Sequence, residues 1–430
     1  MTDMVDAIEA EEPERPRLLD VLGPGLITGA SDDDPSGIAT YSQAGAQFGY
    51  TLGWTLLLTY PLMCAIQMVS AHIGRVTGKG LAGNMRRHYP ATVLYILIGL
   101  LVIANVINLG ADLGAMAAAL HLLLPGPAWL YIAGFALVIA LLEIFVRYSL
   151  YASVLRWLTL SLFAYVATVF AVGVPWGAVA FNLLVPHVQF GGSYLTMVVA
   201  IFGTTISPYL FFWQAAEEVE DEKESPSAKP LLNAPGQAPK ELRRIQWDTL
   251  VGMGFSNLIA LFIMLTTAAT LNAHNITDIQ TSSQAAEALR PIAGSFAFVV
   301  FALGIIGTGL LAVPVLAGSA AYALGEALGW RVGLAQRPAR AQAFYAAIAI
   351  ATVLGAAENF TSLDPIKALF WSAVINGVAA VPIMAIIMLM ASQPKVMGRF
   401  TLGPWLKSLG WLATAAMALA AVGMIATWDN

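Results

Sequence analysis

The sequence is poor in charged residues and contains a single cysteine. Of its 430 residues, 11% are Asp, Glu, Lys or Arg, whereas soluble domains carry about 25%. So few charges cannot cover the water-facing surface of a chain of this length, which excludes an ordinary soluble protein. The single cysteine, Cys64, excludes an internal disulfide and a thiolate metal cluster.

The sequence also lacks the motifs of common catalytic sites. It contains no nucleophile elbow, phosphate-binding loop, dinucleotide fingerprint or HExxH zinc motif. Its five histidines are scattered at the ends of apolar runs and in loops, so they predict no histidine metal site: His72, His88, His121, His187 and His274. We therefore expect a protein that is not an enzyme and that has no resident cofactor, nucleic-acid partner or protein partner.

Long apolar runs are what the sequence has in abundance. Hydrophobic residues make up 58% of the chain, and the mean hydropathy is +0.73. A hydrocarbon core of about 30 Å is crossed by roughly 20 apolar residues in a helix. The runs are continuous rather than alternating, which favours helices over a transmembrane barrel. We predict an all-α integral membrane protein with eleven spans, at residues 21–46, 50–74, 91–122, 127–146, 151–174, 194–217, 246–271, 293–326, 341–357, 362–391 and 405–427.

The positions of the basic residues predict an orientation. Lys and Arg concentrate in the cytoplasmic loops of membrane proteins. With the N-terminus in the cytoplasm, all but two of the 21 Lys and Arg residues lie inside, and only Arg290 and Lys367 lie outside. A shift by one helix would destroy this asymmetry. We therefore expect an inner-membrane protein that is embedded in the lipid bilayer, with a cytoplasmic N-terminus and an external C-terminus.

Three polar stretches complete the predicted organisation. The first 19 residues are acidic and contain proline, so 1–19 is expected to be a disordered cytoplasmic tail. The segment 218–244 is charged and rich in proline, which predicts a cytoplasmic linker. The segment 175–193 is expected to be an external loop between the fifth and sixth spans.

Two of the predicted spans are interrupted by proline and polar residues. The first contains Gly-Ala-Ser-Asp-Asp-Asp-Pro-Ser-Gly at 29–37, and the sixth contains Phe-Gly-Thr-Thr-Ile-Ser-Pro-Tyr at 202–209. Pro35 and Pro208 each remove a backbone hydrogen-bond donor in mid-membrane. Consecutive side chains on a helix point about 100° apart, so the three aspartates cannot share one environment. Because charges inside a membrane are costly and usually functional, at least one of them should face a cavity.

The two interruptions stand at matching places in two five-helix blocks. Pro35 lies in the first helix of one block, and Pro208 lies in the first helix of the next. Paired interrupted helices of this kind indicate a transport site between inverted repeats. We predict a first repeat over 20–174, a second over 194–391, and an eleventh helix with the C-terminus in 392–430. The alternative is a pair of proline kinks with no ligand role.

Residues at the first interruption resemble the natural resistance-associated macrophage protein (NRAMP) family, which moves divalent metals with protons. The family's Asp-Pro-Gly-Asn is matched here by Asp34-Pro35-Ser36-Gly37. The runs Gln43-Ala-Gly-Ala-Gln-Phe-Gly-Tyr50 and Val76-Thr-Gly-Lys-Gly-Leu-Ala82 also resemble segments of that family. The resemblance extends from about residue 20 to residue 391. It implies a LeuT-like fold of 5+5 inverted repeats with broken helices 1 and 6, which works by alternating access on a divalent metal ion.

The resemblance also implies the metal-binding residues. The family's metal-binding Asp falls on Asp34, and its Asn falls on Gly37. The small residue whose carbonyl binds the metal falls on Thr204. The family's helix 6 pattern Met-Pro-His falls on Ser207-Pro208-Tyr209, so the sulfur and imidazole ligands are missing.

Three further positions follow from the same resemblance. A second helix 6 histidine of the family falls on Gln214. A helix 10 Gln falls near Ala373, with Asn376 one turn further on. Asp112 resembles a carboxylate that the family uses in proton transfer, but the partner Glu falls on Ala115.

These departures predict which ion is carried. Methionine sulfur is a soft ligand that favours Mn, Fe and similar ions over hard ions. Mg²⁺ gives up its water reluctantly and keeps several water ligands. A wider, oxygen-only site with one carboxylate therefore suits a largely hydrated Mg²⁺, a pattern that resembles the NRAMP-related magnesium transporters. The missing histidines also favour uniport over tight proton coupling.

Two other functions remain open from the sequence. One is a proton-coupled Mn²⁺ or Fe²⁺ importer of the ordinary family type, against which the missing Met and His count. The other is the same fold carrying an anion or another non-metal solute, since half-helix N-termini can bind anions. Asp34 argues against an anion, because a fixed carboxylate would repel it.

Each candidate residue has a structural alternative. Asp34 can serve as a cap of the broken helix, and Asp32 and Asp33 can either join a wider ion site or stabilise the positive start of the second half-helix. A Ser or Thr in a membrane helix, as at Thr204 and Ser207, often bonds the carbonyl one turn earlier. Tyr209, Asp112 and Asn376 can likewise be buried hydrogen-bonding residues between helices.

Overall fold

The computed structural model describes residues 28–29, 31–146, 158–225, 227–360 and 364–428. Within these ranges the chain forms helices and the loops between them, with no strand. The predicted tail 1–19 lies outside the described residues. The helices that run through the bundle are α3 (Pro35–Phe48), α4 (Gly53–Thr77), α6 (Ala91–His121), α7 (Ala128–Phe145), α9 (Phe163–Ala171), α11 (Gly192–Thr205), α12 (Pro208–Glu224), α13 (Ala238–Thr270), α16 (Ala297–Leu328), α17 (Gln342–Glu358), α18 (Pro365–Ser392) and α20 (Pro404–Ala426).

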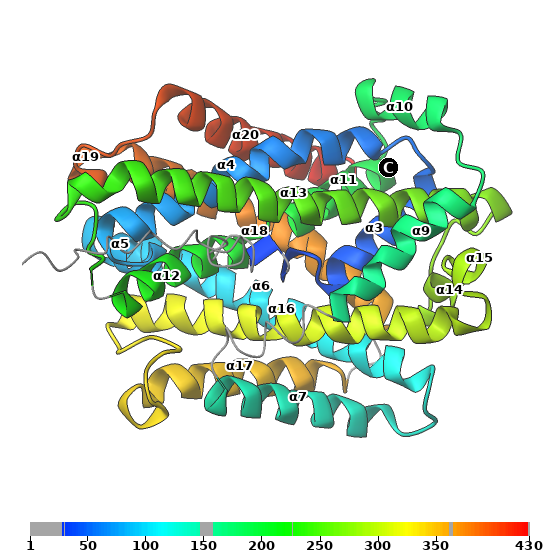
Figure 1. Ribbon diagram of the computed structural model, residues 1–430, viewed down its shortest axis with the longest axis horizontal. Coiled ribbons are helices and arrows are strands. Elements are labelled where there is room, and N and C mark those ends of the chain that lie inside the picture. Colours follow the sequence, from blue (N-terminus) through cyan, green and yellow to red (C-terminus); the bar gives the residue numbers. More distant parts are fainter. Residues whose placement is uncertain (1–27, 30, 147–157, 226, 361–363, 429–430) are drawn as a thin grey trace, which may run out of the picture.

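Short helices connect these long ones at the two ends of the bundle. They are α5 (Leu81–His88), α10 (Trp176–Leu184), α14 (Ser282–Glu287), α15 (Arg290–Ala293) and α19 (Pro394–Met397), with the 3-10 turns η1 (Leu158–Leu162), η2 (Pro235–Gln237), η3 (Asn272–His274), η4 (Gly294–Phe296) and η5 (Pro338–Arg340). Figure 1 shows α5 and α19 at one end, and α10, α14, α15 and the C-terminus at the other.

Among the described residues, eight helices are long and apolar enough to cross a membrane. A ninth candidate is the pair Leu160–Ala171 and Trp176–Leu184, but a bend of 116° separates its halves. The predicted span 341–357 is the shorter apolar helix α17, of 17 residues. The predicted first span, 21–46, is described only from residue 28 onward. Each of the eleven predicted spans therefore overlaps a helix, and the multi-pass membrane protein that the composition predicts is confirmed.

The packing of the helices follows the symmetry of an inverted repeat. If helices 1 and 2 of one block correspond to helices 6 and 7 of the next, a contact between helices 1 and 7 must be matched by one between helices 6 and 2. Helices 1 and 2 are α3 and α4, and helices 6 and 7 are α12 and α13. The structure has both contacts, because α3 packs along α13 and α12 packs along α4. The third helices of the two blocks, α6 and α16, pack against each other, and α20 lies outside the repeats against α4, α11 and α18.

The predicted linker 218–244 is mostly helical. α12 continues through Glu224, and α13 begins at Ala238. Between them Leu231 is buried, and its N–H donates to the carbonyl of Arg75 at 3.2 Å. The segment connects α12 to α13, and its two helical ends carry Glu222, Glu241 and Arg244, which form ion pairs with other helices that composition does not reveal.

The predicted external loop 175–193 contains a helix, α10. Its residue Val179 is buried in a small apolar cluster with Val169 of α9 and Leu265 of α13. The sequence analysis missed this helix because nine residues are too few for a span, and the contacts that stabilise it come from other helices.

Glycines allow α11 and α18 to approach closely near the second interruption. A Cβ atom at Gly203 would collide with the carbonyl oxygen of Ala373, and it would also contact the backbone of Gly377. Small residues at such crossings let membrane helices pack backbone to backbone. This contact fixes the end of α11 against the middle of α18.

We expect Gly203→Leu to destabilise the protein strongly, because the side chain would have to push α11 away from α18. Overpacking of a core typically costs about 1–3 kcal/mol, so the thermal midpoint in detergent should fall by several degrees. Gly99→Leu on α6 is the matched control, since nothing lies within 4 Å of a Cβ atom there. Equal midpoints for the two variants would contradict the close packing.

Candidate functional site

The first and sixth spans are interrupted in the same way. Residues 33–34 and residues 206–207 are not helical, and proline occupies the first position of the helix that follows each interruption. Proline is well suited to that position because its missing N–H would have no helical partner. The positive ends of the α3 and α12 dipoles therefore lie inside the protein, where they favour negative charge.

Asp34 is the N-cap of α3. Its Oδ1 accepts hydrogen bonds from the backbone N–H of Gly37 and the hydroxyl of Ser36, both at 2.7 Å. Its Oδ2 accepts from the side-chain amide of Asn108 at 3.0 Å. The residue is buried, with 1% of its surface exposed. A carboxylate has about four acceptor positions, so the three bonds leave Asp34 able to contact a cation as well as cap its helix.

Asn108, which the sequence analysis did not select, connects Asp34 to α18. While its amide nitrogen donates to Asp34, its amide oxygen accepts from the hydroxyl of Ser372 at 2.7 Å. The signal in the sequence is the spacing of Asn105, Asn108 and Asp112, which places three polar side chains on one face of the otherwise apolar α6. One chain of hydrogen bonds thus joins α3, α6 and α18.

Asp34, Gly37 and Thr204 meet at one point between α3 and α11. A Cβ atom at Gly37 would lie 3.1 Å from the Thr204 hydroxyl, 3.3 Å from the ring of Tyr41 and 3.4 Å from Oδ1 of Asp34. The hydroxyls of Thr204 and Tyr41 are buried, and neither makes a hydrogen bond of normal geometry with the described residues. Tyr41 was not predicted, although it lies one turn after Gly37. These groups form an oxygen-rich point beside one carboxylate.

Ser207 and Tyr209 make contacts that match their structural alternatives. The Ser207 hydroxyl lies 2.6 Å from the carbonyl of Gly203 and 3.0 Å from that of Thr204, so it donates back to the end of α11. The Tyr209 hydroxyl donates to the carbonyl of Ser31 at 3.1 Å, which ties the start of α12 to the first interruption. Ser207 thus stabilises the interruption between α11 and α12, and Tyr209 connects it to the interruption before α3.

Asp32 and Asp33 lie on a different side from Asp34. The hydroxyl of Ser256, on α13, lies 2.6 Å from Oδ2 of Asp32 and 3.1 Å from Oδ1 of Asp33. The second oxygen of Asp32 has no hydrogen bond with the described residues. The structure therefore directs Asp34 toward α6, and Asp32 and Asp33 toward α13. Asp32 and Asp33 share one partner, contrary to the expectation for consecutive helical residues, because the helix has already ended at Asp33.

Of the three remaining predicted residues, Asp112 and Asn376 lie near Asp34 and Gln214 does not. Asp112 is one turn beyond Asn108, and Asn376 is one turn beyond Ser372; both are buried, and neither side chain has a hydrogen bond of normal geometry with the described residues. Gln214 is elsewhere, because it accepts from the Thr28 hydroxyl at 2.6 Å and lies 3.5 Å from Glu218. No three His, Cys, Asp or Glu side chains of the described ranges gather as a metal-binding group. The centre thus offers Asp34 with neutral oxygens.

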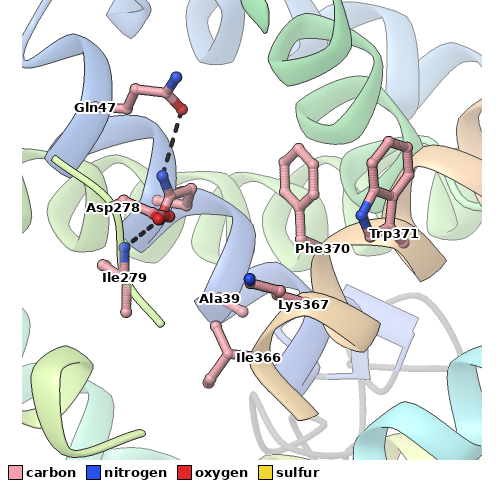
Figure 2. A pocket seen from close by; sticks show the side chains of 9 residues that line it. Ala39, Gln47, Asp278, Ile279, Ile366, Lys367, Phe370 and Trp371 are labelled. Atoms are coloured by element: carbon pink, nitrogen blue, oxygen red, sulfur yellow. Dashed lines mark hydrogen bonds between the residues drawn. The ribbon is translucent and has the colours of Figure 1, made fainter. Parts of the chain in front are cut away.

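A cavity of about 320 Å³ opens at the end of the bundle near α14 and α15 (Figure 2). Gln43 of α3 holds the loop over it, since its side chain accepts from the N–H of Ile279 at 2.8 Å and donates to the carbonyl of Thr277 at 3.1 Å. Below the cavity only about 10 Å³ of space remains among apolar side chains that include Ile38, Phe301 and Ile366. Asp34 itself is 1% exposed and does not line the cavity. The cavity is lined by Ala39, Gln43, Gln47, Asp278, Ile279, Ile366, Lys367, Phe370 and Trp371.

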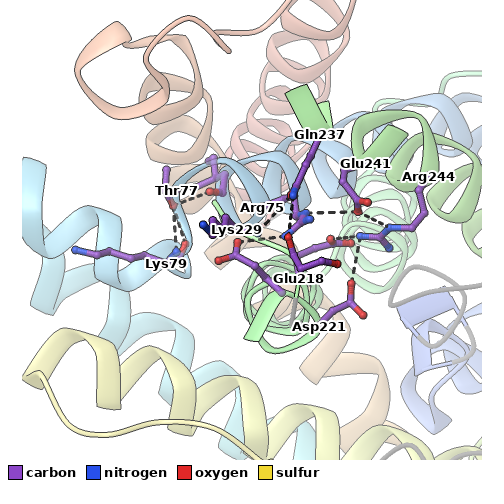
Figure 3. Close-up of polar contacts among 12 residues, drawn as sticks. Arg75, Thr77, Lys79, Glu218, Asp221, Lys229, Gln237, Glu241 and Arg244 are labelled. Atoms are coloured by element: carbon purple, nitrogen blue, oxygen red, sulfur yellow. Dashed lines mark hydrogen bonds and ion pairs between the residues drawn. The ribbon is translucent and has the colours of Figure 1, made fainter. Parts of the chain in front are cut away.

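The opposite end is closed by charged side chains from α4, α12 and α13. Arg75 lies 3.3 Å from Glu222 and 3.5 Å from Glu241. Arg244 pairs with Glu218, and it lies 3.2 Å from Glu241. Figure 3 shows Arg244 close to carboxylates of two different helices. In the acidic run after residue 217, Glu218 and Glu222 are engaged in ion pairs between helices.

We expect Arg244→Gln to destabilise the protein much more than the loss of an exposed ion pair would. The Glu218 side chain is 0% exposed, and removing one partner of a buried ion pair costs about 3–5 kcal/mol. Arg290→Gln is the control, because Arg290 and Glu287 are 65% and 32% exposed, and such pairs contribute about 0–1 kcal/mol. The measurement is the thermal midpoint of each purified variant. Similar shifts for the two would mean that the inner network contributes little.

Comparison with known protein families gives one match over nearly the whole chain. The family model described as "Natural resistance-associated macrophage protein-like" matches residues 25–427. A protein of Klebsiella pneumoniae named divalent metal cation transporter MntH is 25% identical over 405 residues, which cover 92% of this chain and 91% of the relative. A protein of the same name from Yersinia pestis is 26% identical over 309 residues, or 70% and 71% of the two chains.

Solved structures agree in fold. A variant of a manganese transporter from Eremococcus coleocola superposes with a TM-score of 0.74 at 19% identity, covering 97% of this chain and 90% of that one. The nucleobase-cation-symport-1 transporter Mhp1, in a closed conformation, gives a TM-score of 0.57 at 14% identity, covering 95% and 93%. These likenesses confirm the LeuT-like all-α fold with interrupted first and sixth helices that the sequence predicts.

Proposed function

The chain belongs to the natural resistance-associated macrophage protein family, and on that premise we propose that it is a secondary transporter of a hard divalent cation. The cation is Mg²⁺ in the first place and Mn²⁺ in the second. It crosses the inner membrane by alternating access, with no obligatory movement of protons. This is a transport role rather than an enzymatic one, and the divalent ion is the cargo rather than a resident cofactor.

The observation that carries the proposal is the meeting of Asp34, Gly37 and Thr204. Asp34 supplies a negative charge, and the Thr204 hydroxyl lies close to it, beside the Tyr41 hydroxyl, with no hydrogen bond of normal geometry to the described residues. Because residue 37 is glycine, no side chain lies between the Asp34 carboxylate and the Thr204 hydroxyl. All the ligand atoms offered are therefore oxygens, which suit Mg²⁺ and Mn²⁺ better than softer ions.

The buried polar groups around this point suit an ion that keeps part of its water. The Asn376 amide and the Tyr41 hydroxyl are buried, and neither has a hydrogen bond of normal geometry to the described residues; the Tyr41 hydroxyl lies beside that of Thr204. Such groups cost free energy unless a ligand or water satisfies them. Mg²⁺ retains several waters when it binds, and those waters would reach the Asn376 amide and the Tyr41 hydroxyl. Ser207 would take part through the lone pairs of its hydroxyl, because its proton is used by the α11 carbonyls.

Alternating access is supported by the way both ends are closed. Apolar side chains separate the outer cavity from Asp34, and ion pairs join α4, α12 and α13 at the other end. An ion at Asp34 would be enclosed, as a step between outward and inward states requires. The end that carries the ion pairs also carries α5 and α19 with their basic residues (Figure 1), so we place it in the cytoplasm.

A second candidate is a proton-coupled Mn²⁺ or Fe²⁺ importer. The names of the relatives, which mention divalent metal and manganese, favour it. Asp112 also favours it, because a buried carboxylate one turn from Asn108, with no basic partner and no hydrogen bond of normal geometry to the described residues, is suited to accept a proton. Transport of an anion or another non-metal solute on the same fold is less well supported, since Asp34 lies where such a solute would bind.

The experiment is ion uptake into proteoliposomes that contain the purified full-length protein. Mg²⁺, Mn²⁺ and Cd²⁺ are compared with and without a pH gradient, and the lumen pH is recorded. Uptake of Mg²⁺ and Mn²⁺ without acidification, and with little Cd²⁺, would support the proposal. Cd²⁺ uptake coupled to acidification would replace it with the ordinary importer, and no flux of any of the three ions would refute metal transport.

A further inference from the structure

An apolar groove runs along one side of the bundle between α6, α16 and α17. Its volume is about 300 Å³, and every lining side chain is apolar. On α17 the lining consists largely of alanines, among them Ala343, Ala346 and Ala347, whose small side chains leave the space empty. The rim residues Ile350 and Leu354 are 58% and 54% exposed, so the groove opens sideways toward the hydrocarbon of the membrane.

The groove has the length of one lipid leaflet. Its lining extends along α17 from Ala343, at the second position of the helix, to Leu354. Eleven residues of helix span about 16 Å, which is roughly half of a hydrocarbon core of about 30 Å. The groove therefore begins at the end of the bundle that carries α5 and ends near the midplane.

The mouth of the groove is positively charged. Trp330, which lines the groove, stands in the loop 329–341 between α16 and α17. That loop contains three exposed arginines and no Asp or Glu; they are Arg331, Arg337 and Arg340. Arg86 of α5 adds a fourth, because its guanidinium lies directly against Gly329. Among the described residues, none of the four has an ion-pair partner. Two carboxylates nearby accept from backbone N–H groups: Glu220 from Ala335 at 3.3 Å, and Glu326 of α16 from Gly80 at 2.8 Å and Gly83 at 2.9 Å.

We infer that this groove binds one anionic phospholipid of the cytoplasmic leaflet. One acyl chain lies along α17, and the phosphate lies among Arg331, Arg86 and the indole of Trp330. Basic pockets between helices on the cytoplasmic side are suited to anionic headgroups, and tryptophan favours this depth of the membrane. The apolar channel alone would accept any lipid, so the arginines decide the headgroup. The inference does not depend on which ion the protein carries.

The test is lipid binding to the purified full-length protein in detergent, followed by native mass spectrometry. Phosphatidylglycerol and phosphatidylcholine with the same acyl chains are titrated separately. We expect one phosphatidylglycerol to bind more tightly than phosphatidylcholine, by about fivefold for each arginine that contacts it. Arg331→Gln combined with Arg86→Gln should reduce its affinity to that of phosphatidylcholine. Ala346→Leu should weaken the binding of both lipids, because it fills the groove.

Two controls separate this site from general effects. Lys407→Gln is the control for the arginine variants, because it removes a positive charge on α20 at the same end of the bundle. Ala133→Leu is the control for Ala346→Leu, because it enlarges an exposed residue of α7. Neither control should change lipid binding. Excess inorganic phosphate should not displace phosphatidylglycerol. Equal affinity for the two lipids, loss of binding in the controls, or displacement by phosphate would each overturn the inference.

Discussion

Replacing Asp34 with Asn should abolish metal uptake while leaving the protein folded. Asn caps a helix about as well as Asp, so the bonds from Gly37 and Ser36 can persist after the substitution. The negative charge at the meeting point of α3 and α11 is lost. We expect uptake in proteoliposomes to fall by about 100-fold or more, the equivalent of about 3 kcal/mol.

Two further variants distinguish the charge from the cap. Asp34→Ala should also abolish uptake, and it should in addition lower the thermal midpoint, since loss of an N-cap costs about 1 kcal/mol. Asp33→Asn removes a carboxylate that faces Ser256 on α13 instead, and we expect it to reduce uptake by less than about tenfold. Uptake at the wild-type rate in Asp34→Asn would mean that Asp34 is only a cap.

Placing a sulfur ligand at position 207 should change which ion the protein carries. Ser207 stands at the N-cap of α12 beside the carbonyl of Thr204. Methionine there offers a soft ligand, which favours Cd²⁺ and Mn²⁺ over Mg²⁺. We expect Ser207→Met to raise the ratio of Cd²⁺ to Mg²⁺ uptake by about tenfold, or about 1.4 kcal/mol.

The matched control for the sulfur is Ser207→Leu. Leucine is of similar size but has no ligand atom, so it should reduce Mg²⁺ uptake without any gain of Cd²⁺ uptake. Competition of the two ions in one assay gives the ratio directly. An unchanged ratio in Ser207→Met, or the same ratio in both variants, would show that position 207 does not contact the ion.

Combining Ser207→Met with Gly37→Asn is informative about space. A Cβ atom at Gly37 already approaches the Thr204 hydroxyl to 3.1 Å. An amide there therefore has to displace α11 or enter the ion site itself. On the proposed function, we expect the double variant to lose Mg²⁺ uptake in the proteoliposome assay, because two larger side chains would occupy the space that a partly hydrated ion needs; uptake at the wild-type rate would contradict this.

The sequence by itself determined the class of the protein and the place of its two helix interruptions. Low charge and long apolar runs can be accommodated only by a membrane, because each exposed apolar residue would otherwise face water. Proline and glycine among polar residues in two spans fixed both interruptions, since the missing N–H of proline and the loss of helical bonds are local effects. Pro35 and Pro208 stand in the first helix of two successive five-helix blocks, and this correspondence indicated the inverted repeat.

Only the tertiary structure decided which partners each polar residue has. Asp34 differs locally from Asp32 and Asp33 as the cap before Pro35, but its long-range partner does not follow from that: α6 brings Asn108 to Asp34, and α13 brings Ser256 to the other two. Tyr41 and Ser372 were missed, and the charged stretch 218–244 was taken for a linker, because their partners lie far away in the chain. Composition and spacing record what a residue is, whereas a hydrogen bond or ion pair depends on which helices pack together.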